Sequence, residues 1–313
     1  MAGRFAPSPT GAQHLGNART YRLAYWAAKH QGLPLVFRIE DVDSPRVKPW
    51  AVEQAIQDLR WLGLTWDEGP DIGGRAAPYQ QTERVTLYQE VLARLIHADR
   101  VYPCTCTRKD IESAGSAPHF DHEPAVYPGN CSDWSNGDSI PDAGTYCWRF
   151  RSSLRVFKFE DSVLGRQVTR PSETLGDFPV TQKSGDPSYQ LAVVVDDGAM
   201  RITQVVRGND LIASTFRQLQ LFDFLQLPPP TYAHVPLVLG DDGRRLAKRH
   251  GDTRLSTLRE RGVKPSEIIS WAAESAGLLP AGEKVNHVDE VVSYFNWSVM
   301  NQEDVVVESR WIR

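Results

Sequence analysis

The sequence predicts an α/β fold: a parallel sheet covered by helices, interrupted by an irregular α+β insertion and followed by a short helical region. Three observations lead to this expectation. Strand and helix patterns alternate over the first 64 residues, all four cysteines fall between residues 99 and 183, and a pattern of buried elements returns at residue 189. Alternating strands and helices are typical of parallel sheets, and a chain of 313 residues has room for about two domains.

Residues 1–98 are predicted to form the first half of the α/β domain. Apolar residues occur there either in short buried runs or at the i, i+3, i+4, i+7 spacing of a helix face. The predicted elements are, in order, a strand at Gly3 to Ala6, a helix marked by Leu23, Trp26, Ala27 and His30 and closed by Gly32, a strand at Leu35 to Ile39, a helix marked by Val52, Ala55, Ile56, Leu59 and Leu62 and stopped by Gly63, and a helix marked by Val85, Tyr88, Val91, Leu92, Leu95 and Ile96.

The remainder divides into three predicted parts. Residues 99–183 are expected to form a separate α+β module, rich in Pro and Gly, with short alternating segments such as Cys147 to Phe150. Residues 184–240 should complete the α/β domain, and residues 241–313 should form a polar loop and a helical region. The expected elements are a buried strand at Tyr189 to Val195, a helix marked by Ile212, Phe216, Leu219, Phe222 and Leu225, a break at Pro228, Pro229 and Pro230, and a helix containing Ile268, Ile269, Trp271 and Ala272.

Composition and charge exclude several classes of protein. Lys and Arg number 35 and Asp and Glu 39, so the net charge of −4 excludes a uniformly basic nucleic-acid coat but not a local basic patch. Apolar runs such as Leu191 to Val195 are far shorter than the ~20 residues that span a bilayer. Four cysteines are too few for a disulfide scaffold. We therefore expect a cytoplasmic monomer without a membrane span or a secretory signal.

The first motif that carries chemistry lies between the first predicted strand and the first helix, from Ala6 to Asn17. In doubly wound folds this edge of the sheet binds ligands, and the N–H groups of a helix N-terminus attract phosphates. Gly16 would let a flat adenine approach the backbone, and His14 could donate a hydrogen bond to a phosphate. The alternative is a Pro-rich turn between a strand and a helix with an incidental histidine.

The second motif runs from Gly240 to His250 and combines glycines and acidic residues with basic ones. Such a composition favours a mobile loop in which Lys248 neutralises charge on transferring phosphates. Residues 241–264 hold eight basic and four acidic side chains, a local charge of +4 in a chain of net charge −4. This segment is the best candidate for a surface that faces RNA, although a solvated basic loop would look the same.

Together the two motifs resemble the paired signatures of class I aminoacyl-tRNA synthetases. His14-Leu15-Gly16-Asn17 is similar to the HIGH element and Arg245-Leu246-Ala247-Lys248-Arg249 to the KMSKS element, with Asn17 and Ala247 as departures. The resemblance is closest to the glutamyl branch and covers essentially the whole chain. It is carried by Arg4 to Gly11, Phe37 to Asp43, Trp61 to Leu64, Pro187 to Ala192 and Val206 to Leu211.

The resemblance implies a Rossmann-type catalytic domain that binds glutamate and ATP. Arg4 would hold the γ-carboxylate of glutamate, Arg207 would assist with a carboxylate, and Glu40 would accept from the ammonium group, because Arg grips carboxylates in a bidentate manner. Taken singly, these side chains could equally be surface ion pairs, a capping acid and core aromatics. The implied glutamate set is Arg4, Ala6, Ser8, Glu40, Tyr189 and Arg207, without the Asn that the family commonly has at Val193; the implied ATP set is Pro7, His14, Gly16, Asn17 and Lys248, of which His14, Asn17 and Lys248 would be catalytic.

The cysteines suggest a metal site in the insertion. Cys104 and Cys106 form a C-x-C pair and Cys131 follows, so three thiolates would leave one position of a tetrahedral zinc site open. Spacing alone leaves free core thiols as an equal alternative, and leaves Tyr127, His119, His122 and Cys147 as candidates for the fourth ligand. The resemblance implies one structural Zn²⁺ held by Cys104, Cys106, Tyr127 and Cys131, while Cys147 fits a core strand and His119 and His122 an exposed loop.

The length and the cysteine pattern resemble a truncated branch of the family that lacks an anticodon-binding domain. The implied reaction is ATP-dependent activation of glutamate, with Mg²⁺, and transfer to queuosine in the anticodon of tRNA(Asp), with no tRNA needed for activation. Two alternatives stay open: a short glutamyl-tRNA synthetase that charges a tRNA 3′ end, and a non-catalytic RNA-binding relic of the fold.

Overall fold

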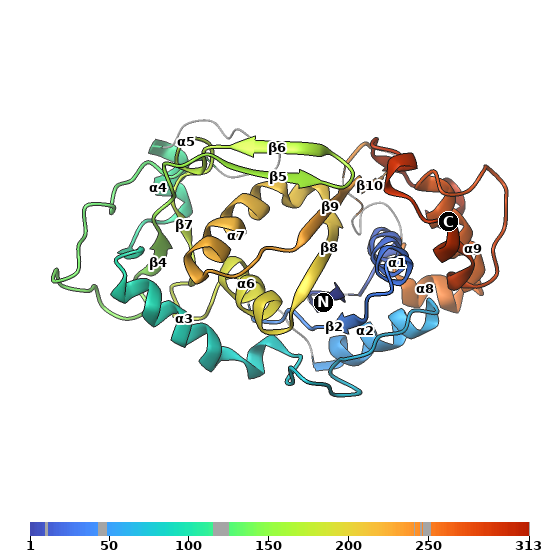
Figure 1. The fold of residues 1–313 in the computed structure, drawn as a ribbon, viewed down its shortest axis with the longest axis horizontal. Coiled ribbons are helices and arrows are strands. Elements are labelled where there is room, and N and C mark those ends of the chain that lie inside the picture. Colours follow the sequence, from blue (N-terminus) through green and yellow to red (C-terminus); the bar gives the residue numbers. More distant parts are fainter. Residues whose placement is uncertain are drawn as a thin grey trace.

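The computed structural model describes residues 1–9, 12–42, 49–114, 125–240, 242–244, 246 and 252–312. The longer helices and the strands of the largest sheet make an α/β core, with helices on both faces of the sheet (Figure 1). The helices are α1 (Leu15–His30), α2 (Pro49–Trp61), α3 (Val85–His97), α4 (Arg108–Ala114), α5 (Pro171–Thr174), α6 (Tyr189–Ala199), α7 (Ile212–Leu225), α8 (Leu255–Glu260), α9 (Pro265–Ser275) and α10 (Ser309–Ile312). The strands are β1 (Ala2–Phe5), β2 (Leu35–Phe37), β3 (Val101–Cys104), β4 (Cys147–Phe150), β5 (Phe157–Asp161), β6 (Gly165–Thr169), β7 (Phe178–Pro179), β8 (Ile202–Gly208), β9 (Thr231–Val235), β10 (Val238–Leu239) and β11 (Val305–Val306).

The largest sheet has six strands in the order β2-β1-β8-β9-β5-β6. All neighbouring pairs are parallel except β5 and β6, which form an antiparallel hairpin at the edge. β1 and β8 are adjacent although about 200 residues separate them, so the sheet joins the two halves of the α/β domain. The predicted α/β class with a mainly parallel sheet is confirmed.

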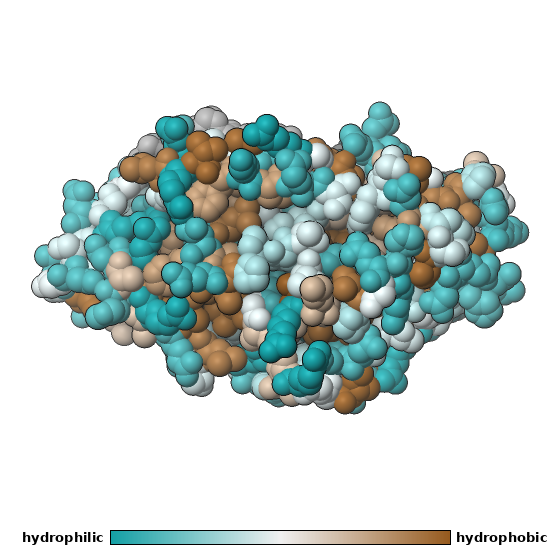
Figure 2. Space-filling view, in the orientation of Figure 1, coloured by the Kyte–Doolittle hydropathy of each residue, from teal (hydrophilic) through white to brown (hydrophobic). Residues whose placement is uncertain are grey.

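Alternate residues of these strands pack into cores on opposite faces. On one face Leu35 and Phe37 pack with α1, α2 and α9; on the other, Val36 packs with Ile202 and with residues of α7. This period of two follows from the pleat of a strand. On the face seen in Figure 2, apolar side chains gather over α6 and α7, while the C-terminal region beside them is mainly hydrophilic.

Two expectations need correction. The segment that starts at Tyr189 is the helix α6, not a buried strand. The prediction failed because α6 is enclosed on nearly every side, so its apolar residues run on continuously and show no helical period. Residues 99–183 are also not a wholly separate module. β3, β4 and β7 form their own antiparallel sheet, but β5 and β6 extend the six-stranded sheet. The domain boundaries themselves remain predictions.

The C-terminal region packs against the first helix. Trp26 of α1 donates to the carbonyl of Val288 in a 3₁₀ turn (Val288–Tyr294), and the buried Arg19 donates to the carbonyl of Pro236 and to Ser275 at the end of α9. These contacts fix α1, whose N-terminus lies at the site described below. Among the described helices, none combines the length and the apolar composition that crossing a membrane requires.

Candidate active site

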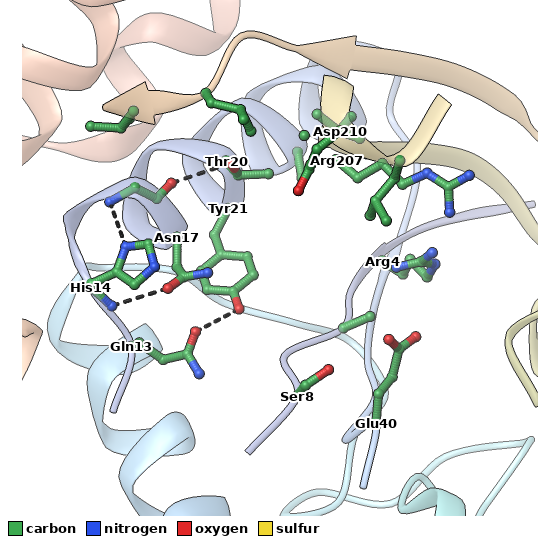
Figure 3. A pocket seen from close by; sticks show the side chains of 18 of the residues that line it. Arg4, Ser8, Gln13, His14, Asn17, Thr20, Tyr21, Glu40, Arg207 and Asp210 are labelled. Atoms are coloured by element: carbon green, nitrogen blue, oxygen red, sulfur yellow. Dashed lines mark hydrogen bonds between the residues drawn. The ribbon is translucent and has the colours of Figure 1, made fainter. Parts of the chain in front are cut away.

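A cavity of about 630 Å³ lies at the carboxyl ends of β1 and β8, where α1 begins (Figure 3). In the view of Figure 3, Arg4, Glu40 and Arg207 occupy one end and His14 and Asn17 the other. The cavity is lined by most of the side chains that the sequence singles out: Arg4, Ala6, Ser8, His14, Gly16, Asn17, Glu40, Tyr189 and Arg207.

His14 caps the N-terminus of α1. Its Nδ1 accepts from the backbone N–H of Gly16 at 3.1 Å, and its own backbone N–H donates to Asn17 Oδ1 at 3.1 Å. With Nδ1 acting as an acceptor, the proton of the neutral ring is on Nε2. No acidic residue lies in the first turn of α1, so the positive end of this helix dipole is not neutralised within the helix.

Gly16 makes room for the ring of His14. A Cβ atom at this position would lie 3.0 Å from the His14 ring and 3.4 Å from Val238. The absence of a side chain at Gly16 therefore leaves room for the His14 ring to fold back over the helix terminus. In the absence of a side chain at Gly16, His14 and Asn17 close the capping box at the cavity wall.

The structure connects the first sequence motif to the chain that follows the second one. The N–H of Leu15 donates to Thr253 at 3.1 Å, and the N–H of Leu255 donates to Gln13 at 2.8 Å. The chain that follows the second motif is thus fastened to the first motif by backbone hydrogen bonds. Lys248 and Ala247 lie outside the described residues.

A buried network of opposite charges supports the glutamate end of the cavity. Arg38 is fully buried and bonds Asp197 at 2.7 Å and Glu40 at 2.8 Å. Arg4 lies beside the same Asp197, at 3.1 Å. Burial by itself lowers the pKa of Arg38, but the surrounding carboxylates, including Asp196, outweigh it and hold this pKa well above its ordinary value. Glu40 is therefore fixed as a carboxylate acceptor at the cavity wall.

Arg207 differs from the other arginines at this site. It is only 5% exposed, yet no carboxylate of the described residues lies within salt-bridge distance. Its bonds go to neutral groups: His234 Nε2 at 3.2 Å, Thr215 Oγ1 at 2.6 Å and the Tyr189 hydroxyl at 3.4 Å. Burial raises the pKa of Tyr189, so its hydroxyl stays protonated. A buried cation without a counterion is costly unless an anion joins it.

Some predicted residues lie elsewhere, and some lining residues were not predicted. Pro7 is buried and does not line the cavity; its carbonyl accepts from the N–H of Glu40 at 3.0 Å. Val193 is a core residue of α6. The residues that sequence reasoning missed include Gln13, Thr20, Tyr21, Ala24, Gln81 and Asp210. Of these, Thr20, Tyr21 and Ala24 follow Asn17 at i+3, i+4 and i+7, a helical spacing that could have revealed them.

The predicted metal ligands converge away from this cavity, at the end of β3. The sulfur atoms of Cys104, Cys106 and Cys131 all lie within 4.8 Å of one another. Cys106 and Cys131 are 3.7 Å apart, which matches the spacing of about 3.8 Å between two sulfurs of a tetrahedral zinc site. The Tyr127 hydroxyl lies 3.4 Å from Cys104 and 3.8 Å from Cys106. His119 and His122 lie outside the described residues.

Cys147 faces Cys104 across the β3–β4 pair, and it acts on this cluster without joining it. Its hydrogen bond, together with the charge of Arg149, lowers the pKa of Cys104 to about 4 against the effect of burial. The same hydrogen bond and burial raise the pKa of Cys147. The lowered pKa of Cys104 favours its thiolate, the form that binds metals, and the raised pKa of Cys147 favours its thiol. The donor set fits Zn²⁺.

Comparisons with known proteins agree with this geometry. The family described as tRNA synthetases class I (E and Q), catalytic domain, matches residues 1–310. A glutamyl-Q tRNA(Asp) synthetase of Rhodopirellula baltica is 51% identical over 97% of this chain and 96% of its own, and one of Symbiobacterium thermophilum is 43% identical over 100% and 97%. A glutamate tRNA ligase from Elizabethkingia meningosepticum, solved in complex with its amino acid, superposes with a TM-score of 0.82 at 28% identity, over 99% of this chain and 67% of that one.

The family is thus shown by agreement over the length of the chain and not by the two short motifs alone. The cavity lies within this matched region, where β1, α1 and β8 meet. The chain belongs to the class I tRNA synthetases of the glutamyl and glutaminyl (E and Q) type.

Proposed function

We propose that this protein activates L-glutamate with ATP and transfers the glutamyl group to queuosine in the anticodon of tRNA(Asp). The observation that supports the activation of glutamate is the state of Arg207. This residue is a buried cation on the cavity wall, and no carboxylate of the described residues neutralises it. The RNA substrate is supported by three relatives named glutamyl-Q tRNA(Asp) synthetase, which are 43–51% identical and of which this chain covers 87–97%.

Glutamate fits the charges at one end of the cavity. Its two carboxylates would bind Arg4 and Arg207, and its ammonium group would donate to Glu40, whose position Arg38 fixes. Ser8 and the hydroxyl of Tyr189 would add hydrogen bonds, and the backbone of Ala6 would line the same wall.

ATP would lie toward the N-terminus of α1. The α-carboxylate of glutamate attacks the α-phosphate, the bond to pyrophosphate breaks, and glutamyl-adenylate forms. His14, Asn17 and the helix terminus would stabilise the phosphate charge from one side and Lys248 from the other, with Mg²⁺ entering as part of the ATP substrate. A queuosine hydroxyl then attacks the adenylate, which releases AMP and leaves an ester on the tRNA.

A structural Zn²⁺ would be held by Cys104, Cys106, Tyr127 and Cys131. Bound there, it would cross-link β3 to the segment that carries Tyr127 and Cys131, where only a small apolar cluster packs. Structural zinc contributes folding free energy directly, so its role is to stabilise this part of the fold.

The two alternatives are weaker. Relatives named glutamate–tRNA ligase are less similar, at 37–38% identity against 43–51% for the glutamyl-Q tRNA(Asp) synthetases, so charging of a tRNA 3′ end is not favoured. A non-catalytic relic would have no reason to keep Arg207 buried without a counterion.

Labelling of purified tRNA(Asp) with radioactive glutamate tests the proposal. We expect incorporation into tRNA(Asp) that carries queuosine and none into the same tRNA that carries guanosine at that position. Efficient charging of tRNA(Glu) would instead establish the ordinary synthetase reaction. A protein that gives no glutamate-dependent ATP–pyrophosphate exchange would be the relic.

A further inference from the structure

The Arg207 side chain is held from behind by buried groups that do not line the cavity. Its Nε donates to His234 on β9 and its Nη2 donates to Thr215 on α7. His234 and Thr215 are both 0% exposed. Thr215 and His234 also bond to each other, at 2.9 Å. One strand, β9, and one helix, α7, therefore fix one edge of the guanidinium plane.

Asp161, the last residue of β5, fixes the tautomer of His234. Its Oδ2 lies 2.6 Å from His234 Nδ1, and its Oδ1 accepts from the backbone N–H groups of Val163 and Leu164, each at 3.0 Å. Burial raises the pKa of Asp161, but these hydrogen bonds outweigh it and lower the pKa below its ordinary value. Because a carboxylate can only accept, the ring proton is on Nδ1, and Nε2 keeps the lone pair that Arg207 uses.

The remaining donors of Arg207 are directed by this arrangement. A guanidinium has five N–H groups. The Nε–H group donates to His234, one N–H group of Nη2 donates to Thr215, and one N–H group of Nη1 donates to the Tyr189 hydroxyl at 3.4 Å. This leaves one N–H on each Nη atom, the pair that a carboxylate binds in a bidentate manner. The Tyr232 ring stacks on His234 at 5.8 Å and lies under the Arg207 guanidinium at 5.2 Å, so it restricts both planes.

We propose that Asp161, His234 and Thr215 are positioning residues that aim Arg207 at a carboxylate of the glutamate substrate. The inference rests on the proposed function, since it requires glutamate in this cavity. It assigns a role in amino-acid binding to Asp161 at the end of β5, a residue that does not line the cavity. A network that merely fills the core would affect the stability of the fold but not glutamate binding selectively.

The substitution Asp161→Asn tests whether the tautomer of His234 matters for glutamate binding. The amide keeps the shape and the bonds from Val163 and Leu164, but it presents an N–H to Nδ1, so the ring proton should move to Nε2 and face Arg207. In ATP–pyrophosphate exchange without tRNA we expect the KM for glutamate to rise about tenfold and the KM for ATP to stay unchanged. ¹⁵N NMR of the imidazoles should show the Nδ1–H form of His234 in the natural protein and the Nε2–H form in the variant.

The pair Thr215→Val and Thr215→Ser provides a matched control that leaves the buried ion pair untouched. Valine keeps the shape but removes the acceptor for Arg207 Nη2, and serine keeps the hydroxyl. We expect Thr215→Val to raise the KM for glutamate several-fold and Thr215→Ser to keep this KM close to that of the natural protein. The melting temperatures of the two variants should agree within about 2 °C. If Asp161→Asn does not fold, this pair carries the test alone.

Arg207→Ala separates failure of the inference from failure of the proposed function. If Arg207→Ala raises the KM for glutamate but Asp161→Asn and Thr215→Val do not, the positioning role is wrong and the pocket stands. Equal increases in the KM values for glutamate and ATP would also overturn the positioning role. If Arg207→Ala itself leaves glutamate binding unchanged, the pocket is elsewhere and the proposed function of this cavity fails.

Discussion

Replacement of Arg4 by alanine removes one of the two cations that we assign to the substrate carboxylates. A hydrogen bond to a charged group contributes about 1.5–3 kcal/mol, and a bidentate pair in a cavity open to solvent about 2–4 kcal/mol in total. At about 1.36 kcal/mol per tenfold change, this predicts a rise of roughly 30- to 900-fold in the KM for glutamate. The fold should tolerate the change, because Asp197, the partner of Arg4, keeps its 2.7 Å bond to Arg38.

The assay is glutamate-dependent ATP–pyrophosphate exchange, with the melting temperature measured in parallel. Arg4→Lys is the matched control: it keeps the positive charge but not the fork that binds a carboxylate through two bonds. We expect an intermediate KM for glutamate in this variant and an unchanged KM for ATP in both. A glutamate KM equal to that of the natural protein in Arg4→Ala would refute the assignment of Arg4 to the substrate.

Three further predictions concern the metal, the second motif and pH. Metal analysis of protein purified without chelators should find about one zinc per chain, and Cys131→Ser should lower both the zinc content and the melting temperature; negligible zinc in the natural protein would contradict the site. Lys248→Ala should lower the maximal rate of pyrophosphate exchange by about 100-fold with little effect on the glutamate KM, whereas an unchanged rate would remove Lys248 from the mechanism. Burial and the neighbouring Arg207 lower the pKa of His234 from its ordinary value of 6.5, against the effect of Asp161 and Asp210. Below pH 6.5 the unfolded chain therefore binds more protons than the folded protein. The free energy of unfolding should fall as the pH falls below 6.5. Urea denaturation should show a weaker dependence in His234→Gln, and an identical dependence would mean that this histidine is not the titrating group.

Much of the fold follows from local patterns in the sequence. The helix from Leu15 to His30 and the helix from Ile212 to Leu225 were predictable from the helical spacing of their large apolar residues, although both helices are buried over most of their residues. The helix from Tyr189 to Ala199 was not, because its apolar residues run almost continuously and a buried helix then resembles a buried strand. The edge hairpin of β5 and β6 was assigned to the insertion, since nothing local shows which sheet a strand joins.

The candidate site was also predictable only in part from the sequence. The residues that touch the cavity lie in short contiguous motifs, so the resemblance to a known family located most of them. The residues that support them do not. Arg38 bonds Asp197, which is 159 positions away, and His234 bonds Asp161, which is 73 positions away. Neither pairing has a spacing that a sequence pattern could reveal. Asp197 lies on the helix α6, and Asp161 and His234 lie on parallel strands, which long crossovers bring together.

The most direct test of the central claim is to locate the glutamyl ester on tRNA(Asp). The tRNA should carry queuosine and lack its 3′-terminal adenosine, and it should be incubated with the protein, ATP and labelled glutamate. The account predicts that the label is incorporated and that nuclease digestion recovers it in the anticodon-loop fragment. Labelling that requires the intact 3′ terminus would contradict it.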